Sequence, residues 1–195
     1  MDYDAQQRFA NLLHHRAQRL APGDAIAPEI TSSATYFTPD IEGLSRVYGR
    51  SGMPTWEVLE DQLGLLEDAP CVAFPSGMGA ISAALIAGLQ AGKKLILPSD
   101  GYYVSRILAS DILRPYGVEV VEVATKDFAS ADFTGASVVL IETPSNPGLD
   151  VCDIALIAGR VHAAGGIVVV DNTTMTPLGQ RPLDLGADAV VTADT

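Results

Sequence analysis

The sequence is poor in positive charge and contains no long apolar run. It holds 12 lysine and arginine residues against 24 aspartate and glutamate residues, so its formal net charge is −12. A surface this acidic argues against a nucleic acid or an anionic membrane surface as partner. No run reaches the length of a membrane span, and charged residues within positions 1–20 argue against a signal peptide. We therefore expect neither a nucleic-acid nor a membrane partner.

Cysteine is also scarce. Cys71 and Cys152 lie far apart and form no C-x-x-C pattern, which is typical of proteins in a reducing compartment. We expect a cytoplasmic protein with two ordinary buried thiols. The adjacent His14 and His15 point to different faces of a predicted helix, so no metal site is expected.

Aliphatic runs alternate with helical segments through most of the chain. Strands are predicted from short apolar runs at 71–74, 94–98, 118–123, 136–142, 166–171 and 190–192. Helices are predicted from apolar spacing and flanking residues at 4–20, 54–69, 77–89, 102–116 and 153–164. This alternation predicts an α/β fold with a mostly parallel sheet and helices on both faces.

The segment 21–54 is rich in proline, glycine, serine and threonine and has no sustained periodicity. A loop of this length is usually functional. We expect residues 1–55 to form a helix and an extended arm, and residues 56–195 to form the first part of a larger domain. The last predicted strand is not followed by the helix that a βα unit needs, so the chain is expected to be truncated relative to a longer protein.

The run Ser-Gly-Met-Gly at 76–79 lies between a predicted strand and a predicted helix. Free N–H groups at a helix start bind phosphate, and glycine lets the backbone approach an anion closely. The same run also suits a plain tight turn. A rival functional interpretation is a dinucleotide-binding fingerprint built on Gly77 and Gly79, with Asp100 as the acid that binds the ribose.

Three further residues are predicted at the same sheet edge, because parallel strands align their carboxyl ends. Asp171 closes the run 166–171 and can cap a helix or meet a cation. Asn146 lies in a turn held by two prolines, and Tyr102 can stack on a flat ring or pack in a core. Together these groups describe a site for a flat, phosphorylated, cationic ring. Pyridoxal phosphate (PLP) is such a ring, and a carboxylate keeps its nitrogen protonated.

These motifs resemble those of the Cys/Met metabolism family of PLP-dependent enzymes, which includes cystathionine γ-lyase, cystathionine β-lyase, cystathionine γ-synthase and methionine γ-lyase. The resemblance extends from about residue 26 to the last residue. It rests on the segments 48–55, 59–60, 76–78, 142–147, 170–173 and 182–188. It implies a fold-type-I PLP enzyme with an aspartate-aminotransferase-like large domain.

The resemblance also implies a role for each matched residue. Asp171 is expected to pair with the ring nitrogen, and Tyr102 to stack on the ring and assist proton transfer. The other expected cofactor-binding residues are Tyr48, Arg50, Ser76, Gly77, Met78, Asn146, Thr173 and Thr195. In this family Tyr48 and Arg50 would reach the phosphate of a neighbouring subunit, which implies a homo-oligomer, a homotetramer built as a dimer of dimers.

In the family, the catalytic lysine that forms the Schiff base follows a Ser-x-Thr motif, which here aligns with residues 193–195. The lysine is therefore expected immediately after Thr195, outside the chain, and the chain alone is expected not to catalyse a reaction. Ala193 stands where serine is usual, which removes one hydroxyl from the phosphate site. Val104 stands where methionine γ-lyases typically carry cysteine, which disfavours that activity.

The resemblance implies an enzyme of sulfur amino-acid metabolism with a small amino-acid substrate. The expected activity is that of a cystathionine γ-lyase, which converts L-cystathionine by γ-elimination into cysteine, 2-oxobutanoate and ammonia. Cystathionine γ-synthase, which catalyses γ-replacement, and methionine γ-lyase are the alternatives within the family. A dinucleotide-binding oxidoreductase is the alternative from another class.

Overall fold

The structure is a computed structural model that describes residues 3–4, 6–7, 9–11, 20–40 and 42–193. The chain divides into two compact units, Met1–Ala73 and Phe74–Thr195. That an arm over residues 1–55 reaches a neighbouring subunit stays a prediction. Of the predicted helix 4–20, the described residues 4, 6–7 and 9–11 are helical, and residue 20 is not. His14 and His15 lie outside the described residues.

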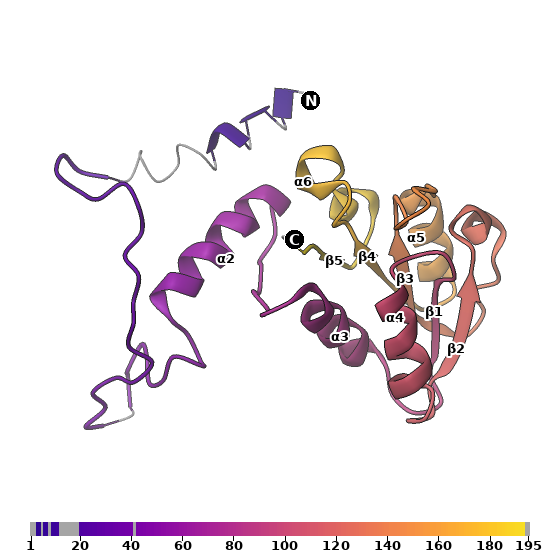
Figure 1. The fold of residues 1–195 in the computed structure, drawn as a ribbon, viewed down its shortest axis with the longest axis horizontal. Helices are drawn as coiled ribbons and strands as arrows, with labels where there is room; N and C mark the ends of the chain where they lie inside the picture. The colour runs from indigo at the N-terminus through magenta and orange to yellow at the C-terminus, as the bar shows by residue number, and fades with distance from the viewer. Residues whose placement is uncertain (1–2, 5, 8, 12–19, 41, 194–195) are drawn as a thin grey trace. The chain divides into compact units, whose positions relative to one another are not determined.

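In the N-terminal unit, the structure describes a long helix over its full length, α2 (Pro54–Glu67) (Figure 1). Proline suits the first turn of a helix, where its missing N–H costs nothing. The helix ends at Asp68, whose φ of 54° is left-handed. Between residues 20 and 53, the described residues form turns and an isolated antiparallel bridge between Thr35 and Tyr48.

The C-terminal unit is built on a parallel sheet with the strand order β2-β1-β3-β4-β5 (Figure 1). The strands are β1 (Lys94–Pro98), β2 (Glu119–Val123), β3 (Ala136–Glu142), β4 (Ile167–Asp171) and β5 (Ala189–Val191). The α-helices are α3 (Gly77–Gly88), α4 (Tyr103–Ile107), α5 (Ile154–Ala163) and α6 (Thr176–Gly179). The 3-10 helices are η2 (Thr125–Ser130) and η3 (Pro182–Leu185). The predicted α/β fold with a parallel sheet is confirmed.

Two apolar layers cover the sheet, one on each face. Leu95 and Leu97 of β1 lie in the layer that contains the buried residues of α3. Ile96 between them lies in the layer that contains the buried residues of α5. Successive residues of a strand point to opposite faces, so a sheet with two covered faces needs apolar residues at nearly every position. This requirement explains why the strands could be recognised as uninterrupted aliphatic runs.

Two predicted elements differ from the structure. Residues 71–74 form no strand, because the Ala73 N–H donates to Oε1 of Glu60 (2.8 Å) and not to a neighbouring strand. Pro70 and Pro75 flank this segment and lack the N–H that a strand ladder uses. The predicted helix 102–116 is α-helical only in α4 and continues as a π-helix, η1 (Leu108–Leu113).

Within the described ranges, no helix is long and apolar enough to cross a membrane.

Candidate functional site

A cavity of about 280 Å³ lies at the carboxyl edge of the sheet in the C-terminal unit. The chain leaves β1 toward one side to form β2 and crosses to the other side to form β3. Ligands of doubly wound folds bind in the crevice at such a switch point. The lining residues are Ser76, Gly77, Met78, Ile81, Tyr102, Glu142, Asn146, Asp171, Thr173, Thr174, Val191 and Ala193.

Seven of the residues predicted from the sequence line this one cavity. They are Ser76, Gly77, Met78, Tyr102, Asn146, Asp171 and Thr173. They come from the start of α3, from the loops after β1 and β3, and from the end of β4, so the fold assembles them from distant parts of the chain. Tyr48 and Arg50 belong to the N-terminal unit, and Thr195 lies outside the described residues. The individual roles of all these residues stay predictions.

The start of α3 forms one end of the cavity. Ser76 is the N-cap, and its Oγ accepts a hydrogen bond from the Gly79 N–H (3.0 Å). The N–H groups of Gly77 and Met78 belong to the first helical turn, where the helix offers no acceptor and an anion can bind. A Cβ on Gly77 would come within 2.6 Å of the Ala193 Cβ. Glycine therefore allows the segment around Ala193 to approach the helix start closely.

Asp171 ends β4 and is 8% exposed. Its Oδ1 accepts the Thr173 N–H (3.0 Å), so the carboxylate forms an Asx turn and does not cap α6. Among the residues that the structure describes, no second donor reaches this carboxylate, which leaves one oxygen for a ligand. The Thr173 Oγ1 accepts the Ala193 N–H (3.0 Å) and holds that segment beside the cavity.

Glu142 was not singled out from the sequence, yet it is buried in the cavity wall (6% exposed). Its Oε2 accepts the Tyr102 N–H (2.6 Å), and its Oε1 accepts the Asn146 N–H (2.6 Å). The pKa of Glu142 lies above its usual value. Burial raises it most, and the charges of Asp171 and Asp100 also raise it, while the hydrogen bonds from the two N–H groups lower it in part. The sequence contained a signal for this residue, because the predicted strand 136–142 ends on Glu142 as the predicted strand 166–171 ends on Asp171. In the structure the two residues are register partners.

Tyr102 is held through its ring as well as its backbone. Its ring makes a T-shaped contact with Tyr103, with centroids 5.4 Å apart and an interplanar angle of 65°. The buried Ser105 donates from its Oγ to the Met78 Sδ (3.9 Å), which joins α4 to the start of α3. Tyr102, which directly precedes α4, is therefore linked to the start of α3.

Two amide side chains, those of the buried Asn172 and the partly buried Gln180, are hydrogen-bonded to each other. Asn172 donates from Nδ2 to the Gln180 backbone O (2.9 Å). Gln180 donates from Nε2 to the Asn172 Oδ1 (3.0 Å) and to the Thr143 backbone O (2.9 Å). A buried polar group is costly when it loses its partner, so this network holds the ends of β3 and β4 together.

Asp100 lies outside the cavity lining. Its Oδ1 accepts the Thr125 N–H (2.9 Å) and the Thr125 hydroxyl (2.8 Å), so it fastens the loop after β1 to η2. An acid that binds a ribose must face the ligand. The dinucleotide-binding interpretation, which rested on Gly77, Gly79 and Asp100, therefore loses the support of Asp100.

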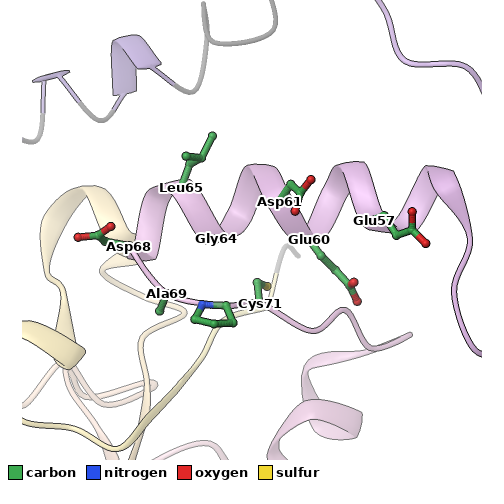
Figure 2. A pocket seen from close by; sticks show the side chains of 9 residues that line it. Glu57, Glu60, Asp61, Gly64, Leu65, Asp68, Ala69 and Cys71 are labelled. Carbon is green, nitrogen blue, oxygen red and sulfur yellow. The ribbon is translucent and has the colours of Figure 1, made fainter. Parts of the chain in front are cut away.

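The N-terminal unit has a pocket of its own, of about 410 Å³, between α2 and the segment 69–71 that runs along it (Figure 2). Four carboxylates line it, those of Glu57, Glu60, Asp61 and Asp68. Arg46 pairs with Glu57, but the lining stays rich in carboxylates. Like charges repel, so this pocket does not suit a phosphate.

Tyr48 and Arg50 contact each other in the N-terminal unit. The Arg50 guanidinium carbon lies 5.1 Å from the centroid of the Tyr48 ring, within reach of a cation–π interaction. Gly49 lies between them and donates its N–H to the Ala34 carbonyl (2.8 Å), and the Ser51 N–H donates to the Tyr48 carbonyl (2.9 Å), which closes a turn around Arg50. Their contact with the phosphate of a neighbouring subunit stays a prediction.

The chain matches the family described as Cys/Met metabolism PLP-dependent enzyme over residues 10–195. It is 48% identical over 155 residues to a Streptomyces coelicolor protein provisionally named as a cystathionine gamma-lyase, covering 76% of this chain and 39% of the relative. It is 37% identical over 177 residues to the cystathionine beta-lyase of Staphylococcus haemolyticus, covering 88% and 45%. The chain thus spans less than half the length of these curated relatives.

A solved structure of the cystathionine gamma synthase of Xanthomonas oryzae pv. oryzae, in complex with aminoacrylate and cysteine, has the same fold. The TM-score is 0.85 at 32% identity, over 95% of this chain and 49% of that chain. This likeness confirms the expected fold-type-I architecture. Since the family match covers nearly all of the sequence, the chain belongs to the Cys/Met metabolism family of PLP-dependent enzymes.

Proposed function

We propose that the full-length protein is a PLP-dependent carbon–sulfur lyase of sulfur amino-acid metabolism, and specifically a cystathionine γ-lyase. The proposed reaction is γ-elimination on L-cystathionine, which with a molecule of water gives cysteine, 2-oxobutanoate and ammonia. The observation that carries the proposal is the single cavity shared by the start of α3, Tyr102, Asn146 and Asp171. The name of the Streptomyces relative supports the choice of activity.

The lining residues fit a flat, phosphorylated, cationic ring. The start of α3 offers N–H groups for the phosphate, and Gly77 lacks the Cβ that would fill the space beside Ala193. Asp171 offers a buried carboxylate oxygen for a protonated ring nitrogen. When bound, PLP supplies an electron sink that stabilises negative charge at the substrate Cα.

The chain contributes binding, orientation and proton placement. Asp171 would keep a proton on the ring nitrogen by accepting its hydrogen bond, and Asn146 could donate its amide to the ring oxygen. Tyr102 would pack against the ring and exclude water there, and its phenol could hold a proton beside the substrate. Ser76 can donate its hydroxyl to a phosphate oxygen while its Oγ still accepts from Gly79.

Cystathionine γ-synthase is the second candidate. The similarity to the Xanthomonas enzyme favours it, with a TM-score of 0.85. Every cavity residue named above serves either reaction, because both begin with loss of a proton from the substrate Cα. Methionine γ-lyase is less favoured, since Val104 stands where such enzymes typically carry cysteine.

The test uses the full-length protein purified with PLP. L-cystathionine should yield 2-oxobutanoate and cysteine in equal amounts, measured by coupled reduction of the oxo acid and by thiol titration. Formation of cystathionine from an O-acylated homoserine and cysteine, without this elimination, would instead establish the synthase. Absence of the absorption band of bound PLP would overturn both assignments.

We also propose a homo-oligomer, a dimer of dimers in which Tyr48 and Arg50 reach the neighbour's phosphate, and a cytoplasmic location. Both cysteines, Cys71 and Cys152, are free thiols, which fits a reducing compartment. Light scattering on the full-length protein should give a mass of four chains. A monomer with full PLP affinity would contradict the role of Arg50 across subunits.

A further inference from the structure

We propose that Glu142 is a positioning residue of the cavity: its carboxylate bridges the backbone of Tyr102 to that of Asn146 and sets the separation of the two. This inference rests on the proposed function, because Tyr102 and Asn146 are the groups assigned to the ring of a bound PLP. Glu142 acts through these neighbours and takes no direct part in the reaction.

The sheet itself does not connect these two walls of the cavity. The pairing of β1 with β3 ends at Ile96 and Val139, whereas the pairing of β3 with β4 continues to Glu142 and Asp171. Beyond Ile96, the last residues of β1 and the loop after Pro98 therefore have no ladder that fixes their distance from β3. The carboxylate of Glu142 replaces the missing ladder at this point.

Both carboxylate oxygens are committed to this bridge. Each accepts one backbone N–H at 2.6 Å, the short distance of charge-assisted hydrogen bonds. The side chain is nearly fully buried, so water does not compete for these bonds. Among the described residues, one oxygen of Asp171, the register partner of Glu142, accepts a hydrogen bond, from the Thr173 N–H. Of these two carboxylates, Asp171 is therefore the one with an oxygen that no described residue engages, and it can bind a ligand.

Gly101 is shaped to admit this carboxylate. A Cβ at this position would come within 2.6 Å of the Glu142 Oε2 and 3.1 Å of the Pro98 Cβ. Gly101 is buried and directly precedes Tyr102. Its lack of a side chain is what lets the carboxylate reach the Tyr102 N–H. Gly101 and Glu142 thus form one unit, although Gly101 lies in the loop after β1 and Glu142 is the last residue of β3.

The first variant is Glu142→Gln in the full-length protein. An amide keeps the shape but has one acceptor oxygen, so one of the two backbone N–H groups would face another donor. The dissociation constant of PLP, titrated into the apoprotein, should rise about tenfold. The visible circular dichroism of bound PLP should weaken, because the ring is held less asymmetrically. Glu122→Gln removes the same charge from an exposed position on β2 and should change neither measurement.

The second variant, Gly101→Ala, displaces the carboxylate without removing its charge. It should also weaken the circular dichroism of bound PLP. In the double variant, PLP affinity should fall by less than the product of the two single effects, because both changes break the same bridge. Hydrogen exchange of the apoproteins should show faster exchange at Tyr102 and Asn146 in both variants. A residue that only stabilised the fold would lower the melting temperature and leave these signals unchanged.

The outcomes separate this inference from the proposed function. If the wild type binds PLP and Glu142→Gln matches it in affinity and circular dichroism, the inference is overturned and the proposed function stands. If the wild type binds no PLP, both fall. If neither variant folds, exchange in the wild-type apoprotein decides: protected amides at Tyr102 and Asn146 support the bridge, and exchange at the rate of an open loop overturns it.

Discussion

Glu142 and Asp171 are register partners at the carboxyl ends of neighbouring strands, and both side chains line the same cavity. Both are buried. Two buried carboxylates side by side are costly unless donors or a cation compensate them. Within the described part of the chain, two backbone N–H groups compensate Glu142, whereas one compensates Asp171. The cavity therefore favours a ligand that brings a positive charge to Asp171.

Replacing Asp171 by alanine tests whether its carboxylate binds the positively charged group of the ligand. The fold should persist, but kcat/KM of the full-length enzyme should fall at least about 100-fold, because the group that holds the ring nitrogen protonated is gone. Steady-state kinetics with L-cystathionine and a melting curve of the apoprotein check this. Glu122→Gln serves as the control, and an unchanged rate for Asp171→Ala would refute its role.

Gly77→Ala should weaken PLP binding by about tenfold or more. The added Cβ would lie 2.6 Å from the Ala193 Cβ, so the segment around Ala193 must move away from the start of α3. A displacement of this size spoils the fit of an anion against the helix N–H groups. Titration of the apoprotein with PLP measures the effect.

Gly159→Ala is the matched control for that substitution. Gly159 lies in α5, and a Cβ there would meet no atom within 4 Å. Alanine in a helix interior should raise the free energy of unfolding by roughly 0.5–1 kcal/mol and leave PLP affinity unchanged. Equal losses of PLP affinity in both variants would contradict the prediction that PLP binding needs glycine specifically at position 77.

Thr173→Val should destabilise the apoprotein by about 1 kcal/mol and lower its affinity for PLP. The Thr173 Oγ1 accepts the Ala193 N–H, and valine has the same shape without the acceptor. Thr173→Ser returns the hydroxyl and should restore most of both quantities. Urea unfolding and PLP titration measure them, and a serine variant as impaired as the valine variant would contradict this hydrogen bond.

The Cys152 thiol should resist alkylation at pH 8. Burial raises its pKa to about 11, against the lowering effect of Thr143. Only the thiolate reacts, so labelling should be about 100-fold slower than in the unfolded chain and should accelerate as the pH rises toward 11. Mass spectrometry after iodoacetamide treatment, with Cys152→Ala to assign the peptide, tests this. Labelling at the unfolded rate would show that the thiol is not shielded.

Several site residues could be placed from the sequence because their positions depend on local patterns. Aliphatic runs reveal the strands, and parallel strands align their carboxyl ends, so Tyr102, Asn146 and Asp171 were expected at one edge. The prediction of a strand at 71–74 was wrong because it relied on the same local signal alone. Its composition suits a strand, but a strand also needs a ladder partner, and the Ala73 N–H binds the Glu60 carboxylate.

Glu142 and Asp100 show where local patterns stop being informative. Each is an acid at or just after the end of a strand, and nothing nearby in the sequence tells which one faces a ligand. Their partners decide this: Asp100 binds Thr125, which is 25 residues away, and Glu142 binds the N–H of Tyr102, which is 40 residues away. Such pairings depend on how separate loops approach in space.

The sequence by itself determined the α/β class, the order of the strands along the chain, the family and hence its cofactor, because apolar periodicity and short motifs are local properties of the chain. Only the tertiary structure decided that the pairing of β1 with β3 stops at Ile96 and Val139 and that a carboxylate bridges the gap beyond it. The physical reason is that a hydrogen bond depends on distances of a few tenths of an ångström between segments whose approach is set by packing of the whole sheet.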